Sequence, residues 1–312
     1  MGVLYIVSVE EAAGKTAVCA GLAMNFVKDG RKVGYLKPQA SAKDGSDSDV
    51  AFMKQILGLD DAVNAPDLIK GRDIVLVESS LGPDAGDAVS RNTCGAAREM
   101  KAKVIAVEAY TGKASKYSDV YKGFGADLLG IIINKVPESL LKSELEAAGA
   151  RLKSKGMNLL GVIPENRVLM AITVAELAES IGGKILNNPE KSGELVANFM
   201  LGAMVVDSGL EYFGRKDKKA AIIRQDRPDM QLAALETSTA CLVLSGDDAP
   251  PLYNVMYKAE TRGIPVIATG NAVNDITVAI EETMLKTRLN QESKLSKLTD
   301  LVGQNLDVAT LA

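Results

Sequence analysis

Short apolar runs alternate with amphipathic stretches along most of this chain. Residues 4–7 form one such run, and after a loop Val18, Leu22 and Phe26 recur at four-residue spacing. This pattern predicts a buried strand and then a helix with one buried face. The same alternation predicts further strands at 32–36, 73–78, 104–107, 128–133 and 159–164. It also predicts helices at 50–57 and 174–181, and one that follows a turn at Gly112 and continues through Val120.

Strands that alternate with helices are typical of an α/β fold with a doubly wound, mostly parallel sheet. A polar, turn-rich segment at 187–193 interrupts the pattern. We therefore expect a first domain over 1–188 and a second, smaller α/β domain over 193–312. In the second domain the pattern predicts an apolar stretch at 195–204, strands at 220–224, 241–245 and 264–269, and helices at 228–235, 251–261 and 276–289.

A leucine stripe lies near the C-terminus, where Leu295, Leu298 and Leu301 recur at three-residue spacing. Such a stripe packs either on its own domain or on a partner chain. The sequence leaves both interpretations open, and we expect the protein to be a homo-oligomer.

The loop between the first strand and the first helix ends in Gly14-Lys15-Thr16. A loop and a helix N-terminus present backbone N–H groups to phosphate oxygens, a lysine at this position reaches the β- and γ-phosphates, and the following hydroxyl binds Mg²⁺. The loop also departs from the usual pattern, because Val9, Ala12 and Ala13 stand where glycines are common. Since residues other than glycine resist positive φ, we expect nucleotide binding more than efficient turnover.

Polar side chains stand at the ends of later predicted strands. Lys37, Glu78 and Asn134 each follow a strand, while Asp47 and Asp49 stand at the entry to the next helix. Lys15 also follows a predicted strand. Because ligands bind at the carboxyl ends of parallel strands, Lys15, Lys37, Glu78 and Asn134 could line one crevice. Several have a simpler interpretation as well. The two aspartates would cap a helix, Lys37 would be a solvated charge, and the asparagine would be a turn residue.

Composition excludes several classes of function. With 47% hydrophobic and 24% charged residues and a net charge of −4, the chain has no long-range attraction for nucleic acid or an anionic membrane. It shows neither a signal sequence nor a long apolar run, so we expect a cytoplasmic protein that binds neither partner. The absence of histidine excludes Ser-His-Asp catalysis and histidine-ligated metals. The three scattered cysteines indicate neither a disulfide framework nor a metal cluster.

Several short motifs match families that are already known. The first domain resembles the dethiobiotin synthetase-like P-loop family, and the second resembles a DRTGG domain. In this order the pair is similar to the N-terminal, non-catalytic portion of long phosphotransacetylases, which implies that the acetyl-transfer domain is missing after residue 312. The matching motifs are Gly14-Lys15-Thr16, Lys37-Pro38, the Asp47/Asp49 segment, Val77-Glu78, Ile133-Asn134-Lys135 and Gly161-Val162-Ile163-Pro164-Glu165, then Asp226-Arg227-Pro228-Asp229-Met230-Gln231 and Ile264-Pro265-Val266-Ile267.

The resemblance implies ATP and Mg²⁺ as cofactors and a role for each matching residue. Lys15 and Lys37 would be the catalytic lysines, the second beside the phosphates or a carboxylate substrate. Asp226, Arg227 and Asp229 would bind a ligand in the second domain, although Asp226 and Arg227 are equally compatible with a structural ion pair. The implied nucleotide contacts are Gly14, Lys15, Thr16, Ala17 and, near the base, Asn134; the implied Mg²⁺ ligands are Thr16, Asp49 and Glu78, with Asp47 as second choice.

The predicted function follows from these residues and from one departure. Residues 77–82 read V-E-S-S-L-G, where the enzymes of the family carry V-E-G-A-G-G, so the dethiobiotin reaction is not expected. We expect an ATP- and Mg²⁺-binding regulatory protein whose second domain senses an unknown small effector, linked to acetyl-phosphate or acyl metabolism. Two alternatives stay open. One is an ATP-dependent ligase or carboxylase that phosphorylates a carboxylate or carbamate, and the other is a partner-docking module that no longer uses nucleotide.

Overall fold

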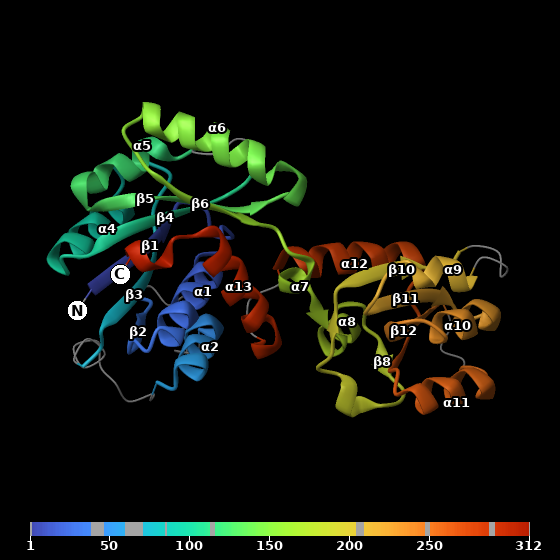
Figure 1. Cartoon of the computed structure of the whole chain (residues 1–312). Coiled ribbons are helices and arrows are strands. Elements are labelled where there is room, and N and C mark those ends of the chain that lie inside the picture. The colour runs from blue at the N-terminus through green and yellow to red at the C-terminus, as the bar shows by residue number, and fades with distance from the viewer. Residues whose placement is uncertain are drawn as a thin grey trace. The chain divides into compact units, whose positions relative to one another are not determined.

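The chain forms two compact units in the computed structural model (Figure 1). One comprises Met1–Leu169 with Leu289–Ala312, and the other comprises Met170–Arg288. This division differs from the predicted one, because the second unit begins before 188 and the C-terminal segment packs with the first unit. The structure describes residues 2–38, 47–59, 71–84, 86–112, 116–203, 209–246, 250–286 and 291–311.

A six-stranded parallel sheet is the centre of the first unit. Its strands follow the order β2-β3-β1-β4-β5-β6. Alternate side chains of β1 enter the two cores on opposite faces of the sheet, Leu4 and Ile6 on one side and Tyr5 and Val7 on the other. The bounds are β1 (Gly2–Ser8), β2 (Val33–Leu36), β3 (Ile74–Ser80), β4 (Lys103–Ala109), β5 (Leu128–Val136) and β6 (Leu159–Pro164).

Helices cover both faces of this sheet, so the doubly wound α/β prediction is confirmed (Figure 1). One face carries α1 (Lys15–Lys28), α2 (Ser48–Leu57) and α13 (Leu295–Asn305), and the other carries α4 (Ala88–Glu99), α5 (Ser118–Tyr121) and α6 (Leu141–Ser154). The apolar pattern did not indicate α4 or α6. The remaining short elements are η1 (Lys122–Asp127), η2 (Glu138–Leu140), α7 (Arg167–Met170), η5 (Glu292–Lys294) and η6 (Val308–Leu311).

The second unit contains a five-stranded sheet of order β10-β11-β12-β13-β8, in which only β8 pairs antiparallel. Its strands are β10 (Asn198–Leu201), β11 (Lys219–Arg224), β12 (Thr239–Ser245), β13 (Val266–Thr269) and β8 (Lys184–Ile185), and β7 (Ile172–Thr173) pairs with β9 (Leu195–Val196). Its helices are α8 (Val174–Ser180), η3 (Pro189–Lys191), α9 (Gly209–Gly214), α10 (Pro228–Leu235), α11 (Tyr253–Arg262) and α12 (Val273–Lys286). The predicted end of α12 at 289 lies outside the described residues.

The leucine stripe packs inside its own unit, because α13 lies against α1 (Figure 1). The two helices approach closely at Gly21, where an added Cβ would lie 2.4 Å from Cγ2 of Val302. The Asn25 amide donates to the carbonyls of Gly21 at 2.8 Å and Thr299 at 3.0 Å. The intramolecular interpretation of the stripe is therefore the one that the structure supports.

Substitution of Gly21 tests this helix contact. We expect Gly21→Ala to lower the free energy of unfolding by about 1–3 kcal/mol, because the methyl group would overpack against Val302. Gly95 is a matched control, since it lies inside α4 with no heavy atom within 4 Å of an added Cβ. Gly95→Ala should stabilise by about 0.5–1 kcal/mol through helix propensity. Urea unfolding measures both, and equal effects of the two variants would contradict the contact.

A lysine is fully buried at the start of β11. Lys219 is 0% exposed, and its ammonium donates to Thr237 Oγ1 at 2.8 Å and to the carbonyls of Ser238 at 2.8 Å and Lys216 at 3.2 Å. Burial lowers the pKa of Lys219 to about 8, because removal from water disfavours the charged form.

The lowered pKa of Lys219 makes stability depend on pH. Between the folded pKa near 8 and the ordinary unfolded value the unfolded chain binds more protons, so stability should rise as pH increases through this window. Thermal denaturation from pH 7 to 10 should show wild-type Tm increasing relative to Lys219→Met. Lys218→Met removes a neighbouring exposed lysine and should leave the profile parallel to wild type. A Lys219→Met profile that also runs parallel to wild type would refute the effect.

Candidate functional site

The loop between β1 and α1 adopts the geometry of a phosphate site with only one residue at positive φ. Gly14 is the N-cap residue of α1, with φ 88° and ψ 30°. No residue from 9 to 13 has positive φ, so Ala12 and Ala13 fit the loop without strain. The first intrahelical bond of α1 joins Val18 N–H to the Gly14 carbonyl at 3.0 Å. By helix geometry the N–H groups of residues 15–17, which include the predicted Ala17, are left for a ligand.

Residues at the end of β5 hold this loop in place. The Asn134 amide donates to the Ala13 carbonyl at 2.9 Å, and the Lys135 ammonium donates to the Ala12 carbonyl at 2.9 Å. An added Cβ on Gly14 would lie 2.3 Å from the Asn134 amide nitrogen, so only glycine fits here. Asn134 therefore supports the loop, and its contact with a base stays a prediction.

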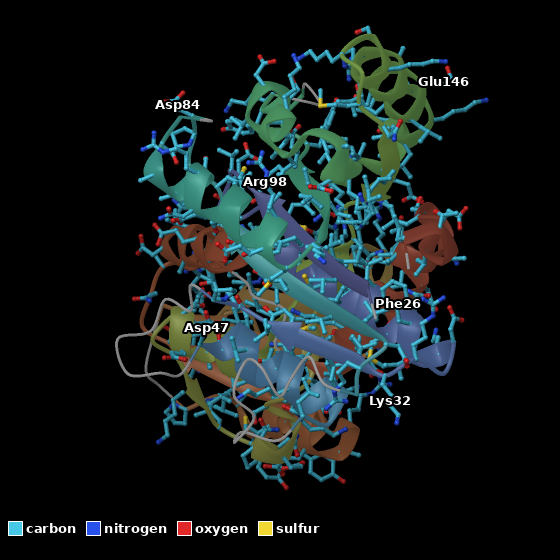
Figure 2. All side chains as sticks on the ribbon, turned by 90° about the vertical axis from the view of Figure 1, so that its left-hand side faces the viewer. Phe26, Lys32, Asp47, Asp84, Arg98 and Glu146 are labelled. Atoms are coloured by element: carbon cyan, nitrogen blue, oxygen red, sulfur yellow. The ribbon has the colours of Figure 1, made fainter. Side chains whose placement is uncertain are left out.

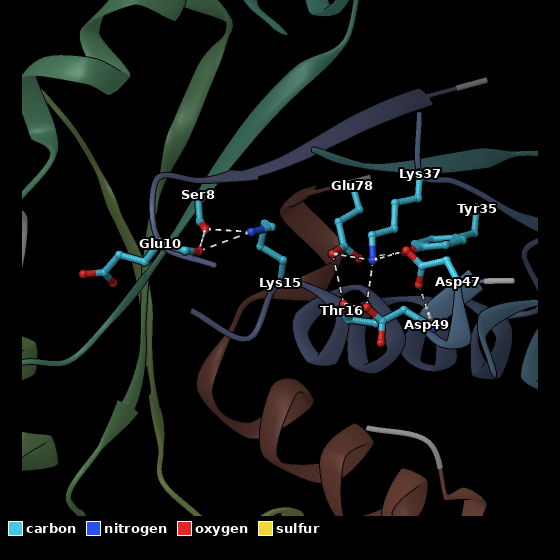
Figure 3. Close-up of polar contacts among 9 residues, drawn as sticks. All are labelled: Ser8, Glu10, Lys15, Thr16, Tyr35, Lys37, Asp47, Asp49 and Glu78. Atoms are coloured by element: carbon cyan, nitrogen blue, oxygen red, sulfur yellow. Dashed lines mark hydrogen bonds and ion pairs between the residues drawn. The ribbon is translucent and has the colours of Figure 1, made fainter. Parts of the chain in front are cut away.

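The Lys15 side chain lies along the inside of the loop (Figure 3). Its ammonium donates to Ser8 Oγ at 2.9 Å and to the Glu10 carbonyl at 3.3 Å. Burial lowers the pKa of Lys15, while the Glu78 carboxylate acts in the opposite direction. The ammonium thus lies among neutral oxygens that a phosphate oxygen could replace.

Three carboxylates surround a second lysine beside Thr16 (Figure 3). The Lys37 ammonium lies 2.7 Å from Asp49 Oδ2, 3.0 Å from Asp47 Oδ2 and 4.0 Å from Glu78 Oε1. The Thr16 hydroxyl lies 3.0 Å from the same Glu78 oxygen and 3.4 Å from the same Asp49 oxygen. The structure therefore brings these five side chains together, and their roles as ligands stay predictions.

Two of the simpler interpretations can now be judged. Asp47 does cap α2, because its Oδ1 accepts the Asp49 N–H at 2.9 Å, and it also pairs with Lys37. Lys37 is not a solvated charge, since its side chain is only 15% exposed. Burial disfavours its charged form, but hydrogen bonds to Asp49 and Asp47 outweigh burial and raise its pKa.

The site lies at the carboxyl end of the parallel sheet. Asp47 lies at this end, whereas Lys32 lies at the opposite end, where β2 begins (Figure 2).

Glu78 is the most buried acid of this group, at 3% exposure. Burial raises its pKa, and hydrogen bonds from Tyr35 and Thr16 and the charge of Lys37 act against that rise. The Tyr35 hydroxyl donates to Glu78 Oε2 at 2.7 Å. The sequence reasoning missed Tyr35 and Ser8. The available signal for Tyr35 was its position two residues before Lys37, which puts both side chains on one face of an extended chain.

The oxygen atoms here supply part of a Mg²⁺ coordination shell, which water or a nucleotide would complete. Within the described ranges, no three acidic, histidine or cysteine side chains are grouped so that they could hold a metal by themselves. Asp49, Glu78 and the Thr16 hydroxyl nevertheless supply hard oxygen ligands side by side. Mg²⁺ commonly uses one or two carboxylates together with phosphate oxygens and water, so this donor set fits it.

The predicted ligand residues of the second unit form two ion pairs at the end of β11. Asp226 pairs with Arg224, and Arg227 pairs with Asp229 at 2.8 Å. Asp226 and Arg227, which the sequence suggested as an ion pair, thus each have another charged partner. The buried Gln231 amide donates to the Arg224 carbonyl at 2.8 Å and fixes the turn. Ligand binding there stays a prediction.

Comparisons with known proteins give a family match within each unit. Residues 176–283 match the DRTGG domain, and residues 3–74 match an AAA domain. The DRTGG match lies inside the second unit. The chain pairs a P-loop domain with a DRTGG domain. In the described part of the DRTGG and P-loop domains, no helix has the length and apolar character needed to cross a bilayer.

The relatives of the whole chain are phosphate acetyltransferases. The chain is 22% identical to the enzyme of Pseudomonas putida and 23% identical to that of Nitratidesulfovibrio vulgaris, with 100% and 99% of this chain covered. The P-loop and DRTGG domains together span only about half of these relatives, 51% of each.

Two solved structures align with about half of this chain each, at low identity. The CBS and DRTGG domains of a Clostridium perfringens pyrophosphatase, complexed with diadenosine tetraphosphate, align at 17% identity and a TM-score of 0.31, covering 50% of this chain and 74% of that chain. The cell division protein FtsY of Thermotoga maritima aligns at 19% identity and a TM-score of 0.40, covering 53% and 62%.

The support that Asn134 gives to the phosphate loop can be tested by stability. We expect Asn134→Ala to lower the free energy of unfolding by about 1–3 kcal/mol, because the Ala13 carbonyl would lose its buried donor. Lys135→Ala removes the neighbouring, exposed contact and should change stability by no more than about 0.5 kcal/mol. Urea denaturation of the two variants would contradict this support if Lys135→Ala proved the more damaging.

Proposed function

We propose that the P-loop domain binds ATP together with Mg²⁺ and that this binding serves regulation. The observation that carries the proposal is the convergence of two lysines, one hydroxyl and two carboxylates at the carboxyl edge of a parallel sheet. The five residues are Lys15, Thr16, Lys37, Asp49 and Glu78.

Each group has a task that its position allows. The N-terminus of α1 and the Lys15 ammonium would bind the phosphates, because Lys15 donates to oxygens of Ser8 and Glu10 that a phosphate can replace. Thr16, Asp49 and Glu78 would hold Mg²⁺, which neutralises phosphate charge. Lys37 would then contact the outermost phosphate or a bound carboxylate.

The segment after Glu78 favours regulation over turnover. Ser79 Oγ lies 3.5 Å from Thr93 Oγ1, and Thr93 donates to the Ser80 carbonyl at 3.1 Å. These hydrogen bonds join the end of β3 to α4. The enzymes of the resembled family have a glycine-rich segment at this point of the chain. We infer that the DRTGG domain senses a small effector, bound near Arg227 and Asp229, and that the whole acts in acetyl-phosphate or acyl metabolism, as the phosphate acetyltransferase relatives suggest.

A second candidate is an ATP-dependent ligase or carboxylase. The position of Lys37 favours it, since an ammonium beside the Mg²⁺ ligands can stabilise a phosphoryl group in transfer. This candidate requires that a carboxylate or amine substrate stimulate phosphate release from ATP. If a panel of such compounds leaves the rate of phosphate release unchanged, the regulatory function is retained.

Calorimetric titration with ATP and Mg²⁺ tests the proposed binding. Wild type should bind, and Lys15→Ala should raise the Kd at least about tenfold, because a charge-assisted contact to phosphate is lost. Lys28→Ala is the matched control. Lys28 lies in the last turn of the same helix with a 59% exposed side chain, and its loss should leave the Kd unchanged.

The proposal fails on either of two results. Equal ATP affinity of wild type and Lys15→Ala would remove the phosphate loop from the binding site. Absence of any heat or thermal shift with ATP and Mg²⁺ would instead favour a partner-docking module that does not use nucleotide.

A further inference from the structure

One ammonium lies among three carboxylates in the P-loop domain. Asp47, Asp49 and Glu78 each lie within 4.0 Å of Lys37, and their side chains are 5%, 16% and 3% exposed. Three carboxylates and the Lys37 ammonium carry a formal charge of −2, and the nearby Lys15 ammonium, which interacts with Glu78, reduces it to −1. The cluster is therefore incompletely neutralised and attracts a further cation.

The oxygens that Lys37 contacts are the ones that a metal ion would use. Asp49 Oδ2 lies 2.7 Å from the ammonium and 3.4 Å from the Thr16 hydroxyl, and Glu78 Oε1 lies 4.0 Å and 3.0 Å from the same two groups. A cation held by Thr16, Asp49 and Glu78 would stand next to the ammonium in its present position (Figure 3). Like charges at such a distance and in a poorly hydrated site repel strongly.

We propose that Lys37 is an internal cation that Mg²⁺ displaces. The ammonium keeps the carboxylates together while no metal is bound, and it makes Mg²⁺ binding weak until a nucleotide arrives. This inference rests on the proposed function for the position of the metal. It assigns Lys37 a task before nucleotide binding, in addition to its contact with phosphate afterwards.

The position of Lys37 in the fold allows this displacement. Lys37 follows the last residue of β2, so its backbone is not held in the sheet. Asp47 pairs with it at 3.0 Å but is fixed as the cap of α2 through the Asp49 N–H, and it does not contact Thr16. The ammonium can therefore leave Asp49 and Glu78 and keep its pairing with Asp47. Displacement then places it beside the Mg²⁺ site, where phosphate oxygens would lie.

Titration with Mg²⁺ alone, on metal-free protein without nucleotide, tests the proposal. Lys37→Met keeps the length of the side chain and removes the charge, so it should bind Mg²⁺ at least about tenfold more tightly than wild type. Lys37→Arg keeps the charge and should bind as weakly as wild type. Calorimetry gives the Kd, and the shift in Tm on addition of Mg²⁺ gives a second readout. Equal Mg²⁺ affinity of wild type and Lys37→Met would overturn the proposal.

Three further variants keep the test decisive. If Lys37→Met does not fold, Asp47→Asn and Asp47→Asn with Lys37→Met give the same comparison with one carboxylate fewer. Glu78→Gln combined with Lys37→Met should lose the tighter binding, and persistence of tight binding there would overturn the assignment to this cluster. Because no nucleotide is present, a failure of ATP binding to wild type leaves this result unaffected, so the two proposals can fail separately.

Discussion

The negative charge of a buried carboxylate must be balanced by hydrogen bonds or by an opposite charge. The arrangement of this site depends on how the charge of Glu78 is balanced. At 3% exposure its charge is costly unless hydrogen bonds and an opposite charge replace water. Tyr35, Thr16 and Lys37 do so from β2, from the start of α1 and from the segment after β2. The compensation of one side chain thus fixes three separate parts of the chain around the end of β3.

Parallel strand order explains why these parts can meet. In the order β2-β3-β1-β4-β5-β6, β3, which carries Glu78, lies between the strand before Lys37 and the strand before the phosphate loop. On the far side of β1 and β4, β5 brings Asn134 beneath the same loop. The two lysines consequently serve different oxygens: Lys15 contacts neutral groups inside the loop, whereas Lys37 contacts carboxylates.

Much of this arrangement follows from local sequence pattern, and the rest does not. Apolar runs that end in Glu78 or Asn134 predict both the strands and the edge where the side chains gather. The partners themselves depend on register between strands, so the bond from Tyr35 to Glu78 was not predictable. The pairing of Arg227 with Asp229 depends on local turn geometry. The stripe of Leu298 and Leu301 does not specify which surface it covers, so its packing with the first unit was not predictable.

The position of α13 also bears on how the protein is made. α1, which carries Lys15 and Thr16, packs on a helix that is synthesised only after the entire second unit. Until residues 295–305 have left the ribosome, Gly21 and its apolar neighbours lack their covering surface. The second unit, by contrast, is continuous in sequence and can fold while translation proceeds. The packing of α1 would then be completed only after the second unit, although α1 precedes that unit in sequence.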